Sequence, residues 1–275
     1  MKKRIRKVYH NFLGIIRRPE MSILPGQIAF YFLMSLIPIL ALVALIASKI
    51  TNSFDLINAI KSGVPEVFAD IIINLIKDAS SSFNFILLLA FYLIIGSNGP
   101  QSIIIAANTL YEIRQPNILK LKIKSIIMIL IIILLLIFMI FVPIFGDLII
   151  KLIIKFVNNP DILLKFKPIY SLFKLFFSFI IIYSCIKLLY TLAPDKKIRS
   201  KDTTVGSLFT AISWIISTEI FAFYIKNIAN YNQLYGNFAN ILILLMWLYF
   251  LAYLFVIGMV LNANYDETSE TKDGK

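Results

Sequence analysis

The chain has 275 residues, of which 59% are hydrophobic and only 15% are charged, and its formal net charge is +12. A mean hydropathy of +0.85 lies far outside the range of ordinary soluble domains, so the sequence predicts an integral membrane protein. The single Cys185 excludes an intrachain disulfide, and the single His10 excludes a His-rich metal site or a Cys/His catalytic pair within one chain.

Long apolar stretches predict six membrane-spanning helices. The clearest stretch lies between Lys124 and Asp147, where twenty-two consecutive residues carry no charge and would form about 33 Å of helix. The expected spans cover residues 26–48, 84–111, 125–146, 169–192, 203–225 and 237–262. We therefore expect an all-α, polytopic membrane helix bundle that forms one integral membrane domain over residues 1–265.

The distribution of lysine and arginine predicts the orientation of the bundle. Seventeen of these residues fall on one side of the expected spans and eight on the other. Short basic loops are retained on the cytoplasmic side, so both termini are expected there, with residues 266–275 as a polar, disordered cytoplasmic tail. The basic segment before the first span, residues 1–22, has apolar residues near helical spacing. It either lies along the anionic inner leaflet or only sets the topology.

Two amphipathic segments are expected outside the membrane. Residues 52–78 have helical periodicity with a break at Gly63 and Pro65, which predicts a small helical cap on the outer surface. After the third expected span, Asp147, Lys151 and Lys155 recur every four residues and form a narrow polar stripe. We interpret both segments as packing elements.

The second expected span contains the sharpest local signal, LIIGSNGPQSIII, which places Asn98, Gly99 and Pro100 near its middle. Glycine and proline weaken a helix interior, and each backbone group that they release must be satisfied by protein or water. One interpretation is two half-helices, with Asn98 capping the second, as at transporter sites. The other is a kinked helix whose backbone groups are satisfied by neighbouring helices.

Polar residues within or at the ends of spans supply the remaining site candidates. Asn108 and Glu112 are four residues apart, so they are expected on one helix face, as a gate, a contact to lipid headgroups or a solvated rim. Lys174 and Glu219 lie at similar expected depths. Because a charge inside the bilayer is costly, we expect them to form an ion pair or to line a polar cavity. Lys187 can reach the inner headgroups.

Several motifs, in order along the chain, resemble those of the YihY/virulence factor BrkB family. They are QIAFYFLMSLIPIL, GSNGPQSIIIAANTLYEIRQP, LYTLAPDKKIRSKDTTVGSLFTAISWIIS and YGNFANILILLMWLYFLAYLFVIGMVLNANY. The resemblance extends from Gly14 to Tyr265 and implies a multi-pass protein of the bacterial inner membrane without a settled activity. Some family members once carried the name ribonuclease BN.

Residue chemistry argues against ribonuclease activity, because the expected cytoplasmic acids are few and no nucleotide motif is present. We expect no enzyme activity, no cofactor, no metal site and no nucleic-acid partner. A transporter or flippase-like protein for a lipid, an envelope precursor or an ion fits better, and a non-transporting scaffold or envelope-integrity factor is the alternative. The expected partners are membrane lipids, with anionic headgroups at the basic cytoplasmic face, and a second copy of the chain. The candidate path residues are Asn98, Gly99, Pro100, Asn108, Glu112, Lys174 and Glu219.

Overall fold

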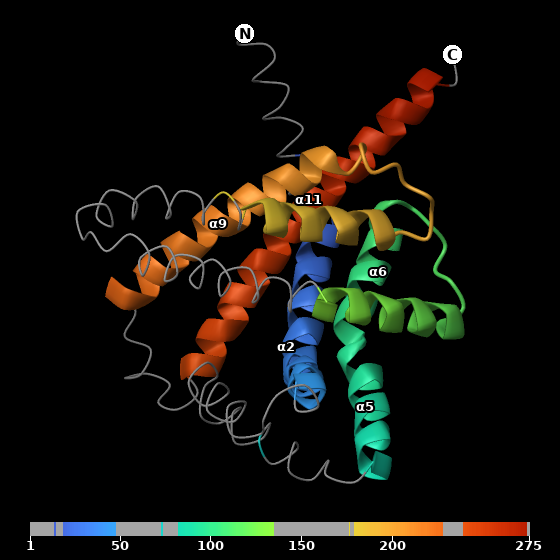
Figure 1. Ribbon diagram of the computed structural model, residues 1–275. Helices are drawn as coiled ribbons and strands as arrows, with labels where there is room; N and C mark the ends of the chain where they lie inside the picture. The colour runs from blue at the N-terminus through green and yellow to red at the C-terminus, as the bar shows by residue number, and fades with distance from the viewer. Residues whose placement is uncertain are drawn as a thin grey trace, which may run out of the picture.

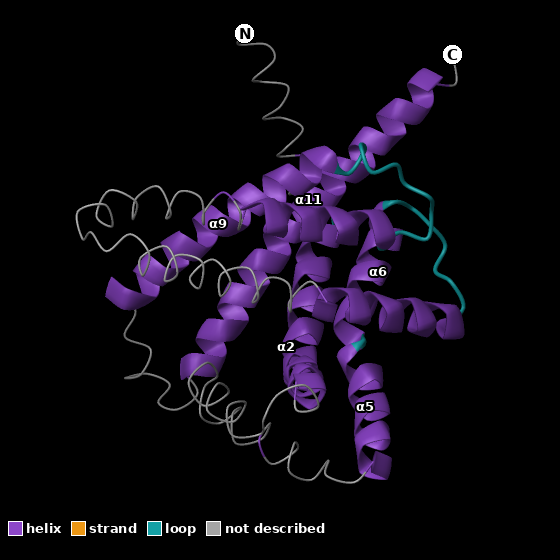
Figure 2. Cartoon of the chain, in the orientation of Figure 1, coloured by secondary structure: helices purple, strands orange, loops and turns teal. Residues whose placement is uncertain are grey.

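The computed structural model describes residues 19–47, 82–134, 179–227 and 239–273, together with positions 14, 73 and 176. These residues form helices joined by short loops and include no strand, which confirms the all-α expectation for the described part of the chain (Figure 2). The helices with complete bounds are α2 (Glu20–Ala47), α5 (Ser82–Gly96), α6 (Asn98–Leu110), α9 (Thr204–Asn227) and α11 (Ala239–Asp273). Helical stretches also cover residues 118–134 and Phe179–Leu192.

Four stretches are long and apolar enough to cross a membrane: Glu20–Leu42, Ile86–Leu110, Thr204–Tyr224 and Leu242–Asn264. They correspond to the expected spans at 26–48, 84–111, 203–225 and 237–262. The other two expected spans, 125–146 and 169–192, fall only partly on described residues, so their crossing of the membrane stays a prediction.

The last helix is longer than expected. α11 continues to Asp273, so residues 266–273 of the expected polar tail are helical. Once a helix is established, each further residue adds a hydrogen bond, and Glu267, Glu270 and Lys272 are good helix formers.

α2 and α11 are the central helices of the described bundle (Figure 1). They pack against each other, α11 also packs against α9, and α2 also packs against α5 and α6. The main core joins Leu24 and Ile28 of α2 with Ile103 of α6 and Phe255 of α11. Large apolar side chains such as Ile86, Phe91 and Ile216 stay more than half exposed, as expected for surfaces that face lipid.

The helix over residues 118–134 lies against the junction of α5 and α6 and crosses it steeply in the view of Figure 1. Gly96 provides the space for this approach, because a Cβ atom there would lie 2.7 Å from Ile129 Cδ1 and 3.5 Å from Pro38 Cβ.

The loop after α6 and the loop before α9 meet at one end of the bundle. Asn108 bonds to Asp195, and the first turn of α9 bonds to Asn262 of α11. This grouping agrees with the expected arrangement of the loops, and the assignment of that end to the cytoplasm stays a prediction.

Three expected features lie outside the described residues. They are the basic N-terminal segment before Pro19, the outer cap over 52–78 apart from position 73, and the amphipathic stripe after residue 146.

Candidate functional site

The junction between α5 and α6 is a kink within one helical path. Ser97, the only residue between the two helices, has helical dihedral angles (φ −69°, ψ −8°). Its N–H donates to Leu93 O at 3.0 Å, and Ser97 O accepts the N–H of Gln101 at 2.9 Å. Ser97, not Asn98, is the N-cap of α6. These two bonds keep Ser97 in the helical path, which agrees with the interpretation of a kinked helix.

A neighbouring helix satisfies the backbone at this kink. Ser35 of α2 accepts the N–H of Gly99 on its Oγ atom at 2.9 Å and donates that hydroxyl to Tyr31 O at 2.7 Å. Gly99 and Pro100 are both buried, and a Cβ atom at position 99 would lie 3.1 Å from Ser35 Oγ. The two residues therefore allow close packing of α2 on α6.

Lys122, from the crossing helix over 118–134, binds the other side of the kink. Its Nζ atom donates to Ile94 O and to Asn98 Oδ1, both at 2.8 Å, and lies 3.5 Å from Gln101 Oε1. We call Lys122 with Ile94, Asn98 and Gln101 the kink site. Of the predicted path residues, Asn98 alone has a partly exposed polar side chain at this kink.

Asn108 belongs to a second polar group at the end of α6. Its Nδ2 donates to Asp195 Oδ2 at 2.6 Å and to Gln115 Oε1 at 3.3 Å, and its Oδ1 accepts the N–H of Asp195 at 2.9 Å. Lys124 Nζ donates to Asp195 Oδ1 at 2.6 Å and to the carbonyl oxygens of Ala193 and Pro194. We call Asn108, Gln115, Lys124 and Asp195 the loop cluster.

The loop cluster lowers the pKa of Asp195 below its ordinary value of 3.8. Partial burial by itself would raise this pKa, but the hydrogen bonds from Lys124 and Asn108 and the positive charge of Lys124 outweigh it. Asn108 is completely buried within these contacts. It therefore holds the loop after Leu192 against α6.

Glu112 does not share a face with Asn108, contrary to the expectation from their spacing. α6 ends at Leu110, and Glu112 follows it with a φ of 54° and an exposed side chain. The N–H of Ile113 donates to Asn108 O at 2.8 Å, and that of Glu112 donates to Thr109 O at 3.2 Å. This pair of bonds is a Schellman motif, with Glu112 at the position that usually holds glycine.

The proposed partnership of Lys174 and Glu219 is not tested, because Lys174 lies outside the described residues. Glu219 lies on α9 with an exposed side chain. It therefore faces away from the described core.

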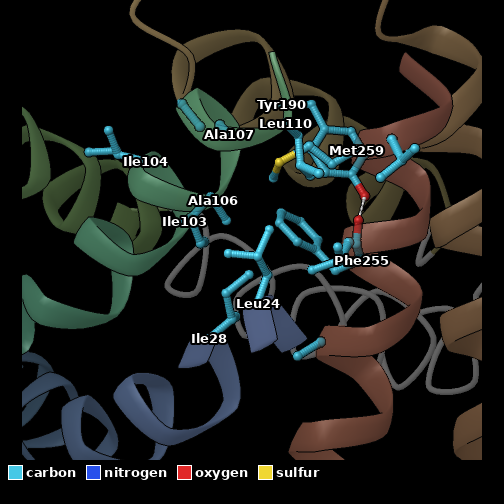
Figure 3. Packing of buried hydrophobic residues seen from close by; sticks show 14 of the residues in the cluster. Leu24, Ile28, Ile103, Ile104, Ala106, Ala107, Leu110, Tyr190, Phe255 and Met259 are labelled. Atoms are coloured by element: carbon cyan, nitrogen blue, oxygen red, sulfur yellow. Dashed lines mark hydrogen bonds between the residues drawn. The ribbon is translucent and has the colours of Figure 1, made fainter. Parts of the chain in front are cut away.

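An apolar cavity of about 200 Å³ lies between the helices of the bundle. In Figure 3, Ile28, Ile103 and Phe255, three of its lining residues, project from α2, α6 and α11 toward one another. The indole ring of Trp214 also lines the cavity. Its N–H is not available to a ligand, because Nε1 donates to Leu251 O at 2.9 Å. The lining residues are Ile28, Ala29, Phe32, Ile103, Ile132, Cys185, Leu189, Trp214, Leu248, Leu251, Ala252 and Phe255.

Two glycines bring α9 and α11 into direct contact beside this cavity. A Cβ atom on Gly206 would overlap Gly258 O, and one on Gly258 would overlap Thr210 Oγ1 and lie 2.5 Å from Tyr190 OH. Asn262 Oδ1 accepts the N–H of Gly206 at 2.7 Å, which satisfies one of the free donors in the first turn of α9. Small residues at such crossings are typical of membrane helix pairs.

Comparison with known families assigns the chain to one family. The sequence profile of the family described as "Virulence factor BrkB" matches residues 16–275. The chain belongs to this family. Among the described residues of this BrkB-family protein, no group of three or more His, Cys, Asp or Glu side chains is close enough to hold a metal ion.

Relatives of the BrkB-family chain are membrane proteins by name or carry a ribonuclease-like name. It is 26% identical over 244 residues to the ribonuclease-like protein YfkH of Bacillus subtilis (strain 168), an alignment that covers 86% of this chain and 87% of YfkH. It is 31% identical over 107 residues to a UPF0761 membrane protein of Vibrio cholerae, covering 39% and 36% of the two chains. A Haemophilus influenzae UPF0761 membrane protein is 28% identical over 95 residues, covering 34% and 35%. No solved structure matches the chain.

Sequence reasoning missed two charged residues that organise the site of this BrkB-family protein. Both fall between the expected spans, Lys122 within residues 112–124 and Asp195 within residues 193–202, and Lys122 is one of the seventeen basic residues that set the expected topology. The signal that could have singled out Lys122 is its place in LKLKIKSII, where lysines alternate with apolar residues at the start of a helix. The residues that these side chains bind are distant in sequence, so their partners were not predictable.

Proposed function

We propose that this BrkB-family chain is a transporter or flippase-like protein of the bacterial cell membrane, and that its passenger is an amphiphile with a hydrocarbon tail. The observation that carries the proposal is the apolar cavity. It lies between helices long enough to cross a membrane, and residues from α2, α6, α9 and α11 all line it.

The chemistry of the cavity favours a lipid tail over a bare ion. Its lining is hydrocarbon, aromatic carbon and one thiol, with the Trp214 donor already bonded within the protein. An ion or a strongly polar solute would lose its hydration there without replacement, whereas an acyl or isoprenoid chain would not. The proposal includes no enzymatic step.

A cavity-filling variant provides the test. Ala252 lines the cavity and is 5% exposed, so Ala252→Phe would place a ring in the space proposed for the tail. Ala90→Phe adds the same group to the exposed surface of α5 and is the matched control. Full-length protein is reconstituted in liposomes with a fluorescent phospholipid, and lipid movement between leaflets is followed by chemical quenching of the outer leaflet.

The proposal would be supported if the native chain moves lipid, Ala252→Phe moves it at least about tenfold more slowly, and Ala90→Phe moves it at the native rate. The alternative function is a non-transporting scaffold. It would be supported by the absence of movement across a panel of lipids and envelope precursors, together with a stable envelope enzyme in the purified complex. Mass spectrometry of lipid that copurifies with the native chain would identify the passenger.

A further inference from the structure

We propose that the ammonium of Lys122 binds the phosphate of an anionic lipid headgroup that reaches the kink site from the side of the bilayer. The lipid would keep its tails in the membrane beside α6. This site is separate from the apolar cavity and does not require that the protein move lipids.

The depth of the kink site is the first argument. Asn98 is the middle residue of the candidate span Ile86–Leu110, twelve residues from either end. At about 1.5 Å per residue, it lies roughly 18 Å from both ends of that span. Lys122 Nζ is 2.8 Å from Asn98 Oδ1, so its positive charge lies near the middle of the candidate span. A charge at that depth is energetically costly, and such charges are usually functional.

The second argument is that the charge of Lys122 is solvated but not neutralised. Its three acceptors, two at 2.8 Å and one at 3.5 Å, are a carbonyl oxygen and two amide oxygens, all neutral. Among the described residues Lys122 contacts no carboxylate, whereas Lys124, two residues later, forms a salt bridge with Asp195. A cation in a medium of low dielectric constant strongly favours an anionic partner.

The third argument is that the kink site has hydrogen-bond donors that the described residues do not fully use. The contact to Gln101 Oε1 is long, so one N–H of the ammonium is weakly used. The side-chain NH₂ groups of Asn98 and Gln101 make no hydrogen bond to other residues in the described ranges. One ammonium and two amide donors on a single face suit the oxygen atoms of a phosphate diester.

The kink site is accessible from the bilayer. Lys122, Asn98 and Gln101 are all half-buried, so their polar atoms lie at the surface of the bundle. Ile94 is 53% exposed and Leu119, one turn before Lys122, is 69% exposed. These apolar side chains would contact the tails while the headgroup reaches the ammonium, whose hydrogen bonds and charge would replace the hydration that the phosphate loses at this depth.

The test measures binding and not transport. Native mass spectrometry of the full-length protein in detergent is titrated with phosphatidylglycerol, with diacylglycerol of the same chains and with inorganic phosphate. Lys122→Gln removes the charge and keeps an amide of similar reach. Lys120→Gln removes an exposed charge two residues earlier on the same helix and is the matched control.

We expect Lys122→Gln to weaken phosphatidylglycerol binding at least about tenfold and Lys120→Gln to change it less than about twofold. Binding of diacylglycerol should not change. Equal weakening by both variants would show a bulk charge effect and overturn the proposal, as would unchanged binding in Lys122→Gln. Displacement of the lipid by inorganic phosphate at similar concentration would show a free-anion site and overturn the assignment to lipid.

If Lys122→Gln does not fold, Gln101→Leu provides the test, because this half-buried side chain makes only the long contact to Lys122 among the residues that the structure describes. It should weaken phosphatidylglycerol binding a few-fold, and unchanged binding contradicts the site. The cavity variant Ala252→Phe should retain phosphatidylglycerol binding at Lys122 even where lipid movement is lost. A failed transport assay with intact, Lys122-dependent binding would therefore reject the proposed function and leave this site standing.

Discussion

Lys124 and Asp195 form a salt bridge of 2.6 Å that joins the start of the crossing helix to the loop after Leu192. Each side chain is 25% exposed, and the same Asp195 carboxylate accepts a hydrogen bond from the buried Asn108. Three segments that are distant in sequence are thus held together at one end of the bundle. The loop cluster therefore provides a measurable test of how that end is stabilised.

We expect Asp195→Asn to lower stability by about 1 kcal/mol at neutral pH, a modest value because the pair is partly exposed. The pKa of Asp195 is lower in the folded chain than its ordinary value, so its contribution is complete above about pH 4 and is lost as the pH falls through the folded pKa. Thermal unfolding in detergent at several pH values would check this. A difference between native and variant chains that persists undiminished at pH 3 would contradict it.

The contact of α9 with α11 should not tolerate a methyl group at Gly258. Gly258→Ala would push against Thr210 Oγ1 and Tyr190 OH, which are themselves bonded at 2.8 Å, so we expect a loss of at least about 2 kcal/mol. Gly26→Ala is the control, because a Cβ atom there meets only Tyr249 Cε2 at 3.9 Å and alanine favours the helix. Comparable melting temperatures for the two variants would show that the helices do not approach as described.

Ser35 should matter more for stability than its size implies. Ser35→Ala leaves the N–H of Gly99 without its acceptor in a buried contact, which costs about 1–3 kcal/mol. The exposed Ser184 on the Phe179–Leu192 helix provides a matched Ser→Ala control with an expected change below about 0.5 kcal/mol. Urea or thermal unfolding measures the stability of both variants. If Ser35→Ala is as stable as the native chain, water or another group can replace the Ser35 hydroxyl.

Glu112→Gly should raise stability by about 1 kcal/mol, because glycine adopts a φ of 54° without the steric cost that glutamate bears. Glu112→Ala keeps the Cβ atom and should give no such gain. Both are measured by thermal unfolding and by the lipid-movement assay. A Glu112→Gly chain that is more stable but no longer moves lipid would support a role of Glu112 in transport.

The positions of four spans were predictable because a bilayer imposes a simple requirement on length and polarity, which Ile86–Leu110 and Leu242–Asn264 both satisfy. The weak point at Gly96 to Pro100 was also visible, since glycine and proline act on their own backbone. Its form as a kink was one of two interpretations, and only the position of Ser35 on another helix explains why the helical path continues.

The partners of the polar side chains were not predictable. Asn108 and Asp195 are eighty-seven residues apart, and no local pattern indicates that they bond. The spacing of Asn108 and Glu112 was misleading because helix periodicity holds only while the helix lasts, and α6 ends between them. Lys122 was assigned to a loop because a positive charge normally marks the membrane boundary.

Two lysines in one turn of the helix over residues 118–134 bind at two different positions along α6. Lys122 binds near the centre of the candidate span, and Lys124 binds the loop cluster at its end. Any rotation or shift of residues 118–134 must therefore alter both levels together. Residues 118–134 thus connect the kink site directly with the loop cluster, so two polar groups of α6 that lie ten residues apart share one helix as their partner.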